Sequence, residues 1–345
     1  MAQGIKRTMQ DAAVDPNEIR VIYADFDNTQ LLTKDQKAVK SLENIRSMLA
    51  LRYLVNMCGL NLVHCTGRVG AQIIRDIEDG KFSGLPFAVA SKAKTIIAGV
   101  GTEIYHLDET GQYVVDEEWQ QKMRDTGFTE AVGKLLTEDG QFQEDFLVSI
   151  SEKIGVDIRL NGQEPDKQTN FKKSMWGNSY DGVTSDDIRK TMIEAMEDRG
   201  VDAKAFSITV SVQTSKIAVD LTPKGATKPE ACEYLMARDN IRPHNVIMAG
   251  DSGNDTHLVN VPGVKISIPA NGQDDLIDQV WDKHPDERNI RHDTKYEAAA
   301  GLIESAKWFG HVSGEQINHA YNKAQEVLEH HYGKNGPKWP EAPKA

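Results

Sequence analysis

Several short apolar runs in this chain each lead into a cluster of polar residues, and this pattern limits the possible folds most strongly. The runs lie at residues 21–24, 60–65, 95–98 and 246–249, with a weaker one at 264–268. A continuous apolar run without alternation is typical of a strand buried on both faces of a parallel sheet. Apolar residues at helical spacing follow the first two runs, so we expect strand, helix and strand in succession. This order predicts an α/β fold, a doubly wound parallel sheet of Rossmann type with helices on both faces.

The pattern changes in the middle of the chain. A helix is expected from Ser185, as N-cap, to Gly200, and two strand-like runs at 206–212 and 216–221 are typical of a hairpin. We therefore predict a smaller α+β domain inserted into the α/β core. The predicted boundaries are a polar leader at 1–17, a core at 18–112 and 216–310, an inserted cap at 113–215, and a C-terminal helix (315–332) with a disordered tail within 311–345.

Charge and composition exclude some classes of function. The 345 residues include 40 Lys and Arg against 52 Asp and Glu, a net charge of −12. A protein that binds nucleic acid through bulk positive charge is therefore excluded, whereas a local basic pocket for a small anion is not. No apolar stretch is long enough to span a membrane, and no signal peptide is expected. The three cysteines lack a C-x-x-C spacing, which predicts free thiols in a reducing compartment, the cytoplasm.

Polar motifs follow the predicted strands at 25–29 (DFDNT), 66–68 (TGR) and 250–255 (GDSGND). Ligands of open parallel sheets bind beyond the carboxyl ends of the strands, so these motifs should share one crevice. They bring four carboxylates to it, from Asp25, Asp27, Asp251 and Asp255. Crowded carboxylates repel each other, and an oxygen-only cluster suits Mg²⁺ together with substrate phosphate oxygens.

A phosphate-binding set is expected at the same edge. Thr66 offers a hydroxyl group, and Lys228 offers a positive charge at the start of a helix. Thr227 and Glu230 have the spacing of a capping box that would fix this helix start. A metal site, a phosphate cradle and a spare carboxylate together indicate phosphoryl transfer, which depends mainly on positioning and charge neutralisation.

The order D-x-D-x-T, T-G-R, helix-start lysine and G-D-S-G-N-D resembles the haloacid dehalogenase-like phosphatases, over roughly residues 18–310. The long gap between Thr66 and Lys228 leaves room for a cap, as in the subgroup of sucrose-phosphate and related sugar-phosphate phosphatases. Segments 100–106, 170–174 and 219–223 also resemble that subgroup.

The resemblance implies a role for each motif residue. Asp25 would be the nucleophile that takes the phosphoryl group as an aspartyl-phosphate, and Asp27 the general acid and then base. Mg²⁺ would be bound by the Asp25 carboxylate, the Asp27 carbonyl and Asp251, with support from Asp255. Thr66 and Lys228 would hold the phosphoryl oxygens.

Substrate contacts are expected from the motif loops and the cap: Thr66, Gly67, Arg68, Thr102, Glu103, Lys172, Lys228 and Asn254. The residues alone leave three alternatives open. Arg68 could pair with a carboxylate, Glu103 could make a structural hydrogen bond, and Lys172 could lie at a solvated cap edge.

The expected function is a Mg²⁺-dependent phosphatase acting on a phosphorylated sugar or glycoside. A sugar phosphomutase of the same fold and a non-catalytic, regulatory sugar-phosphate-binding module are the alternatives. The expected partner is a small phosphorylated sugar, with no nucleic acid and no membrane. The oligomeric state is left open, as is whether the C-terminal helix docks on its own core or on a neighbour.

Overall fold

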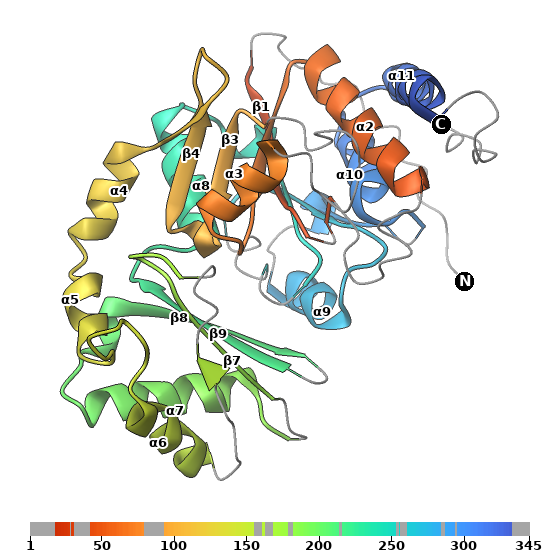
Figure 1. Ribbon diagram of the computed structural model, residues 1–345. Coiled ribbons are helices and arrows are strands. Elements are labelled where there is room, and N and C mark those ends of the chain that lie inside the picture. The colour runs from red at the N-terminus through yellow and green to blue at the C-terminus, as the bar shows by residue number, and fades with distance from the viewer. Residues whose placement is uncertain are drawn as a thin grey trace, which may run out of the picture.

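The computed structural model divides into a large α/β part and a smaller part below it (Figure 1). The structure describes residues 18–27, 29–30, 42–78, 93–154, 161–162, 168–178, 182–213, 216–252, 255, 261–283, 287–293 and 295–332. The predicted leader (1–17), the end of the predicted tail (333–345) and Asn254 lie outside these residues.

Eight strands of the described residues form one sheet in the order β12-β11-β10-β1-β2-β3-β4-β5. Pairing is parallel from β12 through β3, as predicted, whereas β4 and β5 continue the sheet in antiparallel fashion. The strands are β1 (Arg20–Asp25), β2 (Leu60–Cys65), β3 (Thr95–Ala98), β4 (Glu103–Leu107), β5 (Tyr113–Val115), β10 (Val246–Ala249), β11 (Lys265–Ile268) and β12 (Ile290–His292).

Both faces of this sheet are buried. In β1, Val21 and Tyr23 belong to one apolar cluster, while Ile22 and Ala24 belong to the other. Burial on both faces therefore explains the continuous apolar run in the sequence, as predicted, since neither face of the strand meets water. The first face is covered by α8 (Lys228–Arg238) and α9 (Asp274–Lys283), and the second by α2 (Leu42–Met57), α3 (Gly70–Glu78), α10 (Ala298–Trp308) and α11 (Gly314–Tyr332).

The smaller part is an antiparallel sheet with helices, and we refer to it as the cap. Its strands follow the order β6-β7-β9-β8. They are β6 (Asn161–Gly162), β7 (Lys173–Asn178), β8 (Phe206–Gln213) and β9 (Lys216–Pro223), accompanied by α5 (Phe128–Gly133), α6 (Glu144–Ile154) and α7 (Ser185–Glu197). The helix α4 (Glu117–Arg124) packs on β4 and leads from the core into the cap.

Both predicted cap boundaries, 113 and 215, differ from the structure. β5 pairs with β4 in the large sheet, so the chain leaves the core only after residue 115. β9 pairs with β7 and with the whole of β8, so it belongs to the cap although the prediction assigned it to the core. The physical reason is the hairpin, because two strands that pair along their length cannot lie in different sheets.

The two predicted helix starts have different outcomes. Thr227 is the N-cap of α8 and Glu230 is at position N3, which confirms that capping box. For α7 the predicted N-cap Ser185 is wrong, because Thr184 is the cap and pairs with Asp187 in a capping box. The capping box needs its acidic partner three residues on, and only Thr184 has one at that spacing.

The C-terminal helix docks on the core of its own chain. α11 packs along α2, and the Tyr321 hydroxyl lies 3.2 Å from Ser47 Oγ. Ile317, Tyr321 and Leu328 are almost fully buried in this contact. Full burial of a large apolar side chain contributes about 1.5–3 kcal/mol, so this helix is an integral part of the core.

His311 joins the start of this extension to the large sheet. Lys265 Nζ lies 3.1 Å from His311 Nε2, and Arg20 Nη1 donates to the His311 carbonyl at 2.7 Å. Burial lowers the pKa of His311 to about 3, with a smaller contribution from the charges of Lys265 and Arg20. The folded chain therefore keeps this imidazole neutral at a pH where the unfolded chain protonates it.

We predict that His311 makes the fold less stable in mild acid. Below the unfolded pKa of about 6.5 the unfolded state binds one more proton, so stability falls as the pH drops towards 3. Between pH 7 and pH 5 this loss should be about 2 kcal/mol. Urea unfolding at both pH values should show a smaller loss in His311→Gln than in the wild type. Identical losses in the two proteins would contradict the assignment.

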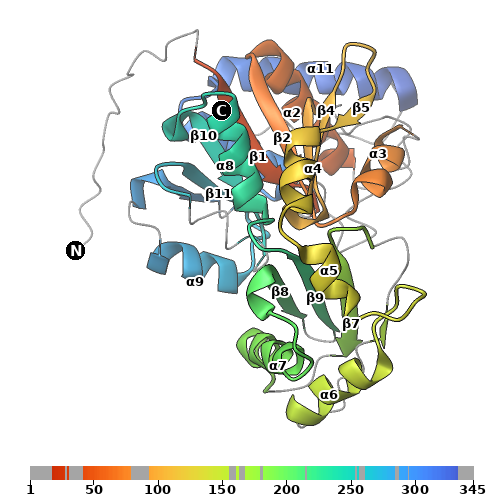
Figure 2. The same ribbon diagram turned by 90° about the vertical axis from the view of Figure 1, so that its left-hand side faces the viewer.

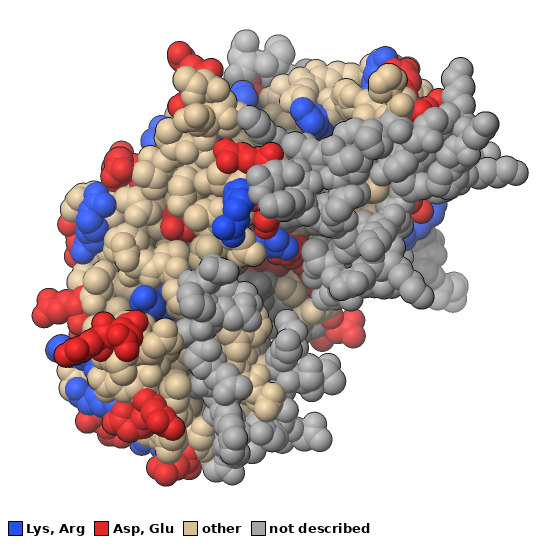
Figure 3. All heavy atoms as spheres, in the orientation of Figure 1, with Lys and Arg blue, Asp and Glu red and all other residues tan. Residues whose placement is uncertain are grey.

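Two further findings concern the surface and the helices. Acidic and basic side chains are interspersed over the face shown in Figure 3, and neither sign forms a continuous field there. Among the residues that the structure describes, no helix is long and apolar enough to cross a membrane.

Candidate active site

The carboxyl ends of β1, β2 and β10 meet at one edge of the large sheet. The register pairs Asp25 with Cys65 and Ala24 with Ala249. Asp25, Thr66 and Asp251 therefore leave three neighbouring strands side by side, and all three are buried. This is the crevice in which parallel sheets bind their ligands.

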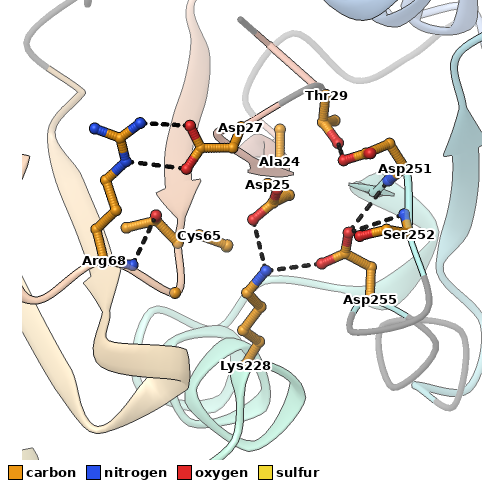
Figure 4. A network of polar contacts seen from close by, with 12 residues as sticks. Ala24, Asp25, Asp27, Thr29, Cys65, Arg68, Lys228, Asp251, Ser252 and Asp255 are labelled. Carbon is orange, nitrogen blue, oxygen red and sulfur yellow. Dashed lines mark hydrogen bonds and ion pairs between the residues drawn. The ribbon is translucent and has the colours of Figure 1, made fainter. Parts of the chain in front are cut away.

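Lys228 lies between two carboxylates at this edge (Figure 4). Its Nζ atom donates to Asp25 Oδ1 at 2.6 Å and to Asp255 Oδ1 at 2.7 Å. The lysine is the first residue of α8, and the capping box at Thr227 fixes the backbone from which its side chain extends. With only 2% of its surface exposed, the ammonium group acts inside the protein and not as a surface charge.

Burial and crowding decide the protonation states. Burial raises the pKa of Asp25, and the nearby Asp255 and Asp251 raise it further, against the opposing effect of Lys228. Burial opposes the charge on Lys228, yet Asp25 and Asp255 raise its pKa above its usual range. The lysine therefore stays charged, while the carboxylates beside it need more positive charge than it supplies.

This shortage of positive charge fits a metal ion. Asp25, Asp251 and Asp255 each offer a carboxylate oxygen, and these oxygens lie within 4.8 Å of one another. When all three are ionised, Lys228 leaves two negative charges in excess. An all-oxygen donor set with that excess suits a hard divalent cation.

Other polar groups hold two of these carboxylates in place. Thr29 Oγ1 donates to Asp251 Oδ1 at 3.1 Å. The backbone amides of Asp251 and Ser252 donate to Asp255 Oδ2 at 3.2 and 3.4 Å. One oxygen of Asp255 thus accepts from its own loop and the other from Lys228, and its supporting role at a metal stays a prediction.

Asp27 does not join the carboxylate cluster. Arg68 grips it with two bonds, from Nε to Oδ2 at 3.0 Å and from Nη2 to Oδ1 at 2.6 Å (Figure 4). Asp76 of α3 lies 3.4 Å from the same guanidinium group. The expectation of four converging carboxylates is therefore corrected to three, and of the two roles left open for Arg68 the structure shows pairing with a carboxylate. Asp27 stays outside the cluster because its charge is paired with Arg68 of the T-G-R motif.

Lys172 connects the cap with the core. Its Nζ donates to the Gly67 carbonyl at 2.9 Å and lies 3.3 Å from Asp220 Oδ1. Ser174 Oγ also donates to Asp220 Oδ1, at 2.5 Å. The solvated-edge alternative for Lys172 is thus wrong, because only 5% of the residue is exposed. Its contact with substrate stays a prediction, as does that of Gly67.

The two candidates from the loop after β3 use their polar groups locally. Thr102 is fully buried and donates from Oγ1 to the Gly99 carbonyl at 3.0 Å. Glu103 Oε2 accepts from the backbone amide of Gly70 at 2.7 Å, and burial raises its pKa. The structural hydrogen bond considered for Glu103 is therefore present, and substrate contact by these two residues stays a prediction.

Sequence reasoning missed a polar cluster at the first cap junction. Asp116, the N-cap of α4, accepts from Tyr234 at 3.2 Å and from Arg238 at 2.7 Å, both on α8. His106 Nε2 lies 2.9 Å from the same carboxyl group. The acidic residues that follow Asp116 in the sequence were the available signal for this helix start.

Comparison with known families shows which family the chain belongs to. The model of the family described as sucrose-6F-phosphate phosphohydrolase matches residues 18–310. The chain belongs to this family. The match spans the core and the cap and ends before α11, so the C-terminal helix lies outside what the family model describes.

Individual relatives match this chain at low sequence identity. A probable sucrose-phosphatase 3a of Arabidopsis thaliana is 32% identical over 183 residues, which cover 48% of this chain and 41% of that protein. The chain thus matches less than half the length of this plant relative. A kanosamine-6-phosphate phosphatase of Bacillus subtilis is 22% identical over 70% of this chain and 79% of that protein.

Solved structures show the fold. The sucrose-phosphatase of Synechocystis, solved with sucrose and phosphate, superposes with a TM-score of 0.56 at 22% identity, covering 86% of this chain and all of that one. A haloacid dehalogenase-like hydrolase from Bacillus subtilis superposes with a TM-score of 0.51 at 16% identity, covering 85% and 93% of the two chains. The expected haloacid dehalogenase-like fold is confirmed.

Proposed function

We propose that this protein is a Mg²⁺-dependent phosphatase that hydrolyses a phosphorylated sugar through an aspartyl-phosphate on Asp25. The observation that carries the proposal is the buried Asp25–Lys228–Asp255 arrangement beside Asp251, at the carboxyl edge of the sheet. A buried carboxylate that is paired with a lysine, in a cluster suited to a divalent cation, can act as a nucleophile towards phosphorus.

The first half-reaction forms the covalent intermediate. A carboxylate oxygen of Asp25 bonds to phosphorus while the bond from phosphorus to the sugar oxygen breaks. Asp27, with one carboxyl oxygen protonated and the other still held by Arg68, gives its proton to that leaving oxygen. Lys228 and Thr66 hold the phosphoryl oxygens, a role supported by the position of Thr66 just after β2 and of Lys228 at the start of α8.

The second half-reaction restores the enzyme. Asp27, now ionised, takes a proton from water while the water oxygen bonds to phosphorus, and the bond from phosphorus to Asp25 breaks to release orthophosphate. Asp25, Asp251 and the Asp27 carbonyl would hold Mg²⁺, which supplies charge neutralisation at the phosphoryl group. The excess negative charge of the cluster supports this cation.

The substrate is proposed to be a sugar or glycoside phosphate of the sucrose-phosphate type. Support comes from the family and from its named relatives, which include sucrose-phosphatases and a kanosamine-6-phosphate phosphatase. Lys172 and Glu103 stay the proposed sugar contacts, with Arg68, Thr102 and Asn254 as further candidates. We place this reaction in the cytoplasm, where the buried thiols Cys58, Cys65 and Cys232 stay reduced.

A panel of phosphate esters tests the proposal. Release of orthophosphate should be measured with Mg²⁺ from sucrose 6F-phosphate, kanosamine 6-phosphate, glucose 6-phosphate and p-nitrophenyl phosphate. Hydrolysis of at least one sugar phosphate, lost on chelation and restored by Mg²⁺, is the expected result. Absence of release from every ester would overturn the proposed activity.

We predict that Arg68 acts through Asp27 and not on the phosphoryl group. Arg68→Met should lower kcat on a sugar phosphate about 10- to 100-fold, because protonation of a poor leaving group depends on an oriented acid. The rate with p-nitrophenyl phosphate, whose leaving group needs little protonation, should fall about threefold or less. Steady-state kinetics on both substrates give the comparison. Equal losses on both would place Arg68 at the phosphoryl group instead.

A further inference from the structure

A buried loop of unusual backbone conformation lies beside the phosphate-binding groups. Gly99, Val100 and Gly101 follow β3, are all buried, and have φ values of +59°, +64° and +109°. A valine at positive φ is disfavoured, since its branched side chain crowds the backbone. Such a conformation persists only where the surroundings hold it, so the contacts of this loop show what it is built to do.

On one side the loop holds the segment that carries Thr66. The amide of Gly99 donates to the Arg68 carbonyl at 2.7 Å, and that of Val100 donates to the Thr66 carbonyl at 3.1 Å. Both bonds are made by backbone groups. The position of the loop therefore sets the position of the 66–68 segment directly.

On another side the loop presses against the helix start that carries Lys228. A Cβ atom added to Gly101 would lie 2.2 Å from the carbonyl carbon of Thr227 and 2.7 Å from the backbone nitrogen of Lys228. No side chain fits there, and glycine is required by the closeness of the two backbones. A shift of Gly101 must move the helix start, or open a gap beside it.

On its third side the loop is held by α4, the helix that leads from the core into the cap. Trp119 of α4, fully buried, donates from Nε1 to the Gly101 carbonyl at 3.0 Å. The next residue, Gln120, donates from Nε2 to the Thr102 carbonyl at 3.2 Å. The Trp119 ring also packs on Tyr234 of α8, with centroids 4.9 Å apart, and α4 stands beside α8 in Figure 2.

We propose that Trp119 is a positioning residue that couples the cap to the phosphate-binding groups through the loop 99–101. The inference rests on the proposed function, because it concerns the same phosphoryl site. α4 fixes Gly101, which lies against the backbone of Lys228, and the adjoining Gly99 and Val100 hold the backbone that carries Thr66. Coupling is reciprocal, so binding of an anion at Lys228 must also stabilise the docking of α4.

The test uses inorganic phosphate as the probe, with Mg²⁺ present, on the full chain. Trp119→Phe keeps an aromatic ring in the buried position and removes the donor to Gly101 together with part of the buried indole. We expect about tenfold weaker binding of phosphate by calorimetry, and a similar fall in kcat. In the wild type, phosphate should slow hydrogen exchange at the backbone amides of α4, and Trp119→Phe should lose this protection.

Two further variants control for stability and folding. Phe128→Leu alters a buried aromatic contact between α5 and β8, away from the loop, and should leave phosphate affinity unchanged. Gln120→Met removes the second, half-buried donor and should weaken phosphate binding in the same direction by a smaller factor. It gives a result even where Trp119→Phe folds poorly.

The outcomes separate the inference from the proposed function. Weaker phosphate binding in Trp119→Phe or Gln120→Met, but not in Phe128→Leu, supports the coupling even in a chain that hydrolyses no sugar phosphate. Equal phosphate affinity and equal α4 protection in the wild type and in both loop variants overturn the coupling, whatever the activity. An equal loss in Phe128→Leu also overturns it, because the effect would then be one of general stability.

Discussion

Asp25→Asn is expected to lower kcat for hydrolysis of a sugar phosphate by about 10³-fold or more, because the amide cannot form the acyl phosphate. The amide oxygen can still accept the bond from Lys228 that the carboxylate accepts at 2.6 Å. The loss should therefore appear in kcat rather than in the fold. Initial rates of orthophosphate release from the best sugar phosphate give the measurement.

Stability provides the control for this variant. Because burial and neighbouring carboxylates raise the pKa of Asp25, replacing it with a neutral group removes a repulsion. The free energy of unfolding without metal should be equal to that of the wild type or higher. Asp125→Asn, at an exposed carboxylate on the cap, should retain the wild-type rate. Full activity in Asp25→Asn would show that another group takes the phosphoryl.

Lys228→Met is expected to affect both activity and stability. It leaves Asp25 and Asp255 buried side by side without the ammonium group that contacts both. Removing one partner of a buried ion pair costs about 3–5 kcal/mol, so the free energy of unfolding at pH 7 should fall by that amount. Loss of the positive charge that Lys228 would place beside the phosphoryl oxygens should also lower kcat by about 10²–10³-fold.

The pH dependence of the Lys228→Met defect identifies its cause. As the pH falls, Asp25, whose pKa burial and the neighbouring carboxylates raise, takes up a proton and its repulsion with Asp255 disappears. The stability difference from the wild type should therefore shrink towards pH 4. Urea unfolding at pH 7 and pH 4 measures this difference. A defect of the same size at both values would mean that lost packing of the lysine stem, and not charge, is responsible.

The core of the site could be predicted because a short stretch of sequence shows where each strand ends, and parallel pairing then brings these strand ends together. Asp25, Thr66 and Asp251 each directly follow an apolar run, and parallel pairing brings such positions together whatever the loops between them do. Lys228 was found for a similar reason, since Thr227 and Glu230 form a capping box within four residues.

The missed features depend on contacts that no local pattern encodes. Asp27 and Arg68, which follow two neighbouring strands, pair with each other. The sequence pattern was equally compatible with either side chain facing the phosphate. β4 and β5 extend the parallel sheet in antiparallel fashion because a tight turn follows β3, which strand-helix spacing does not indicate. α2 is buried along most of its length because α11, distant in the sequence, covers it.

The most direct test of the central claim is to trap the phosphoryl group on the enzyme. Asp27→Asn should slow the second half-reaction but not the first when the leaving group needs little protonation. Mixing this variant with p-nitrophenyl phosphate and Mg²⁺, followed by an acid quench, should therefore leave the covalent intermediate in place. Tandem mass spectrometry of the peptides should then find one phosphoryl group on the peptide that contains Asp25, and none after Asp25→Asn is added. A phosphoryl group on any other residue, or turnover by the wild type with no trapped intermediate, would contradict the account.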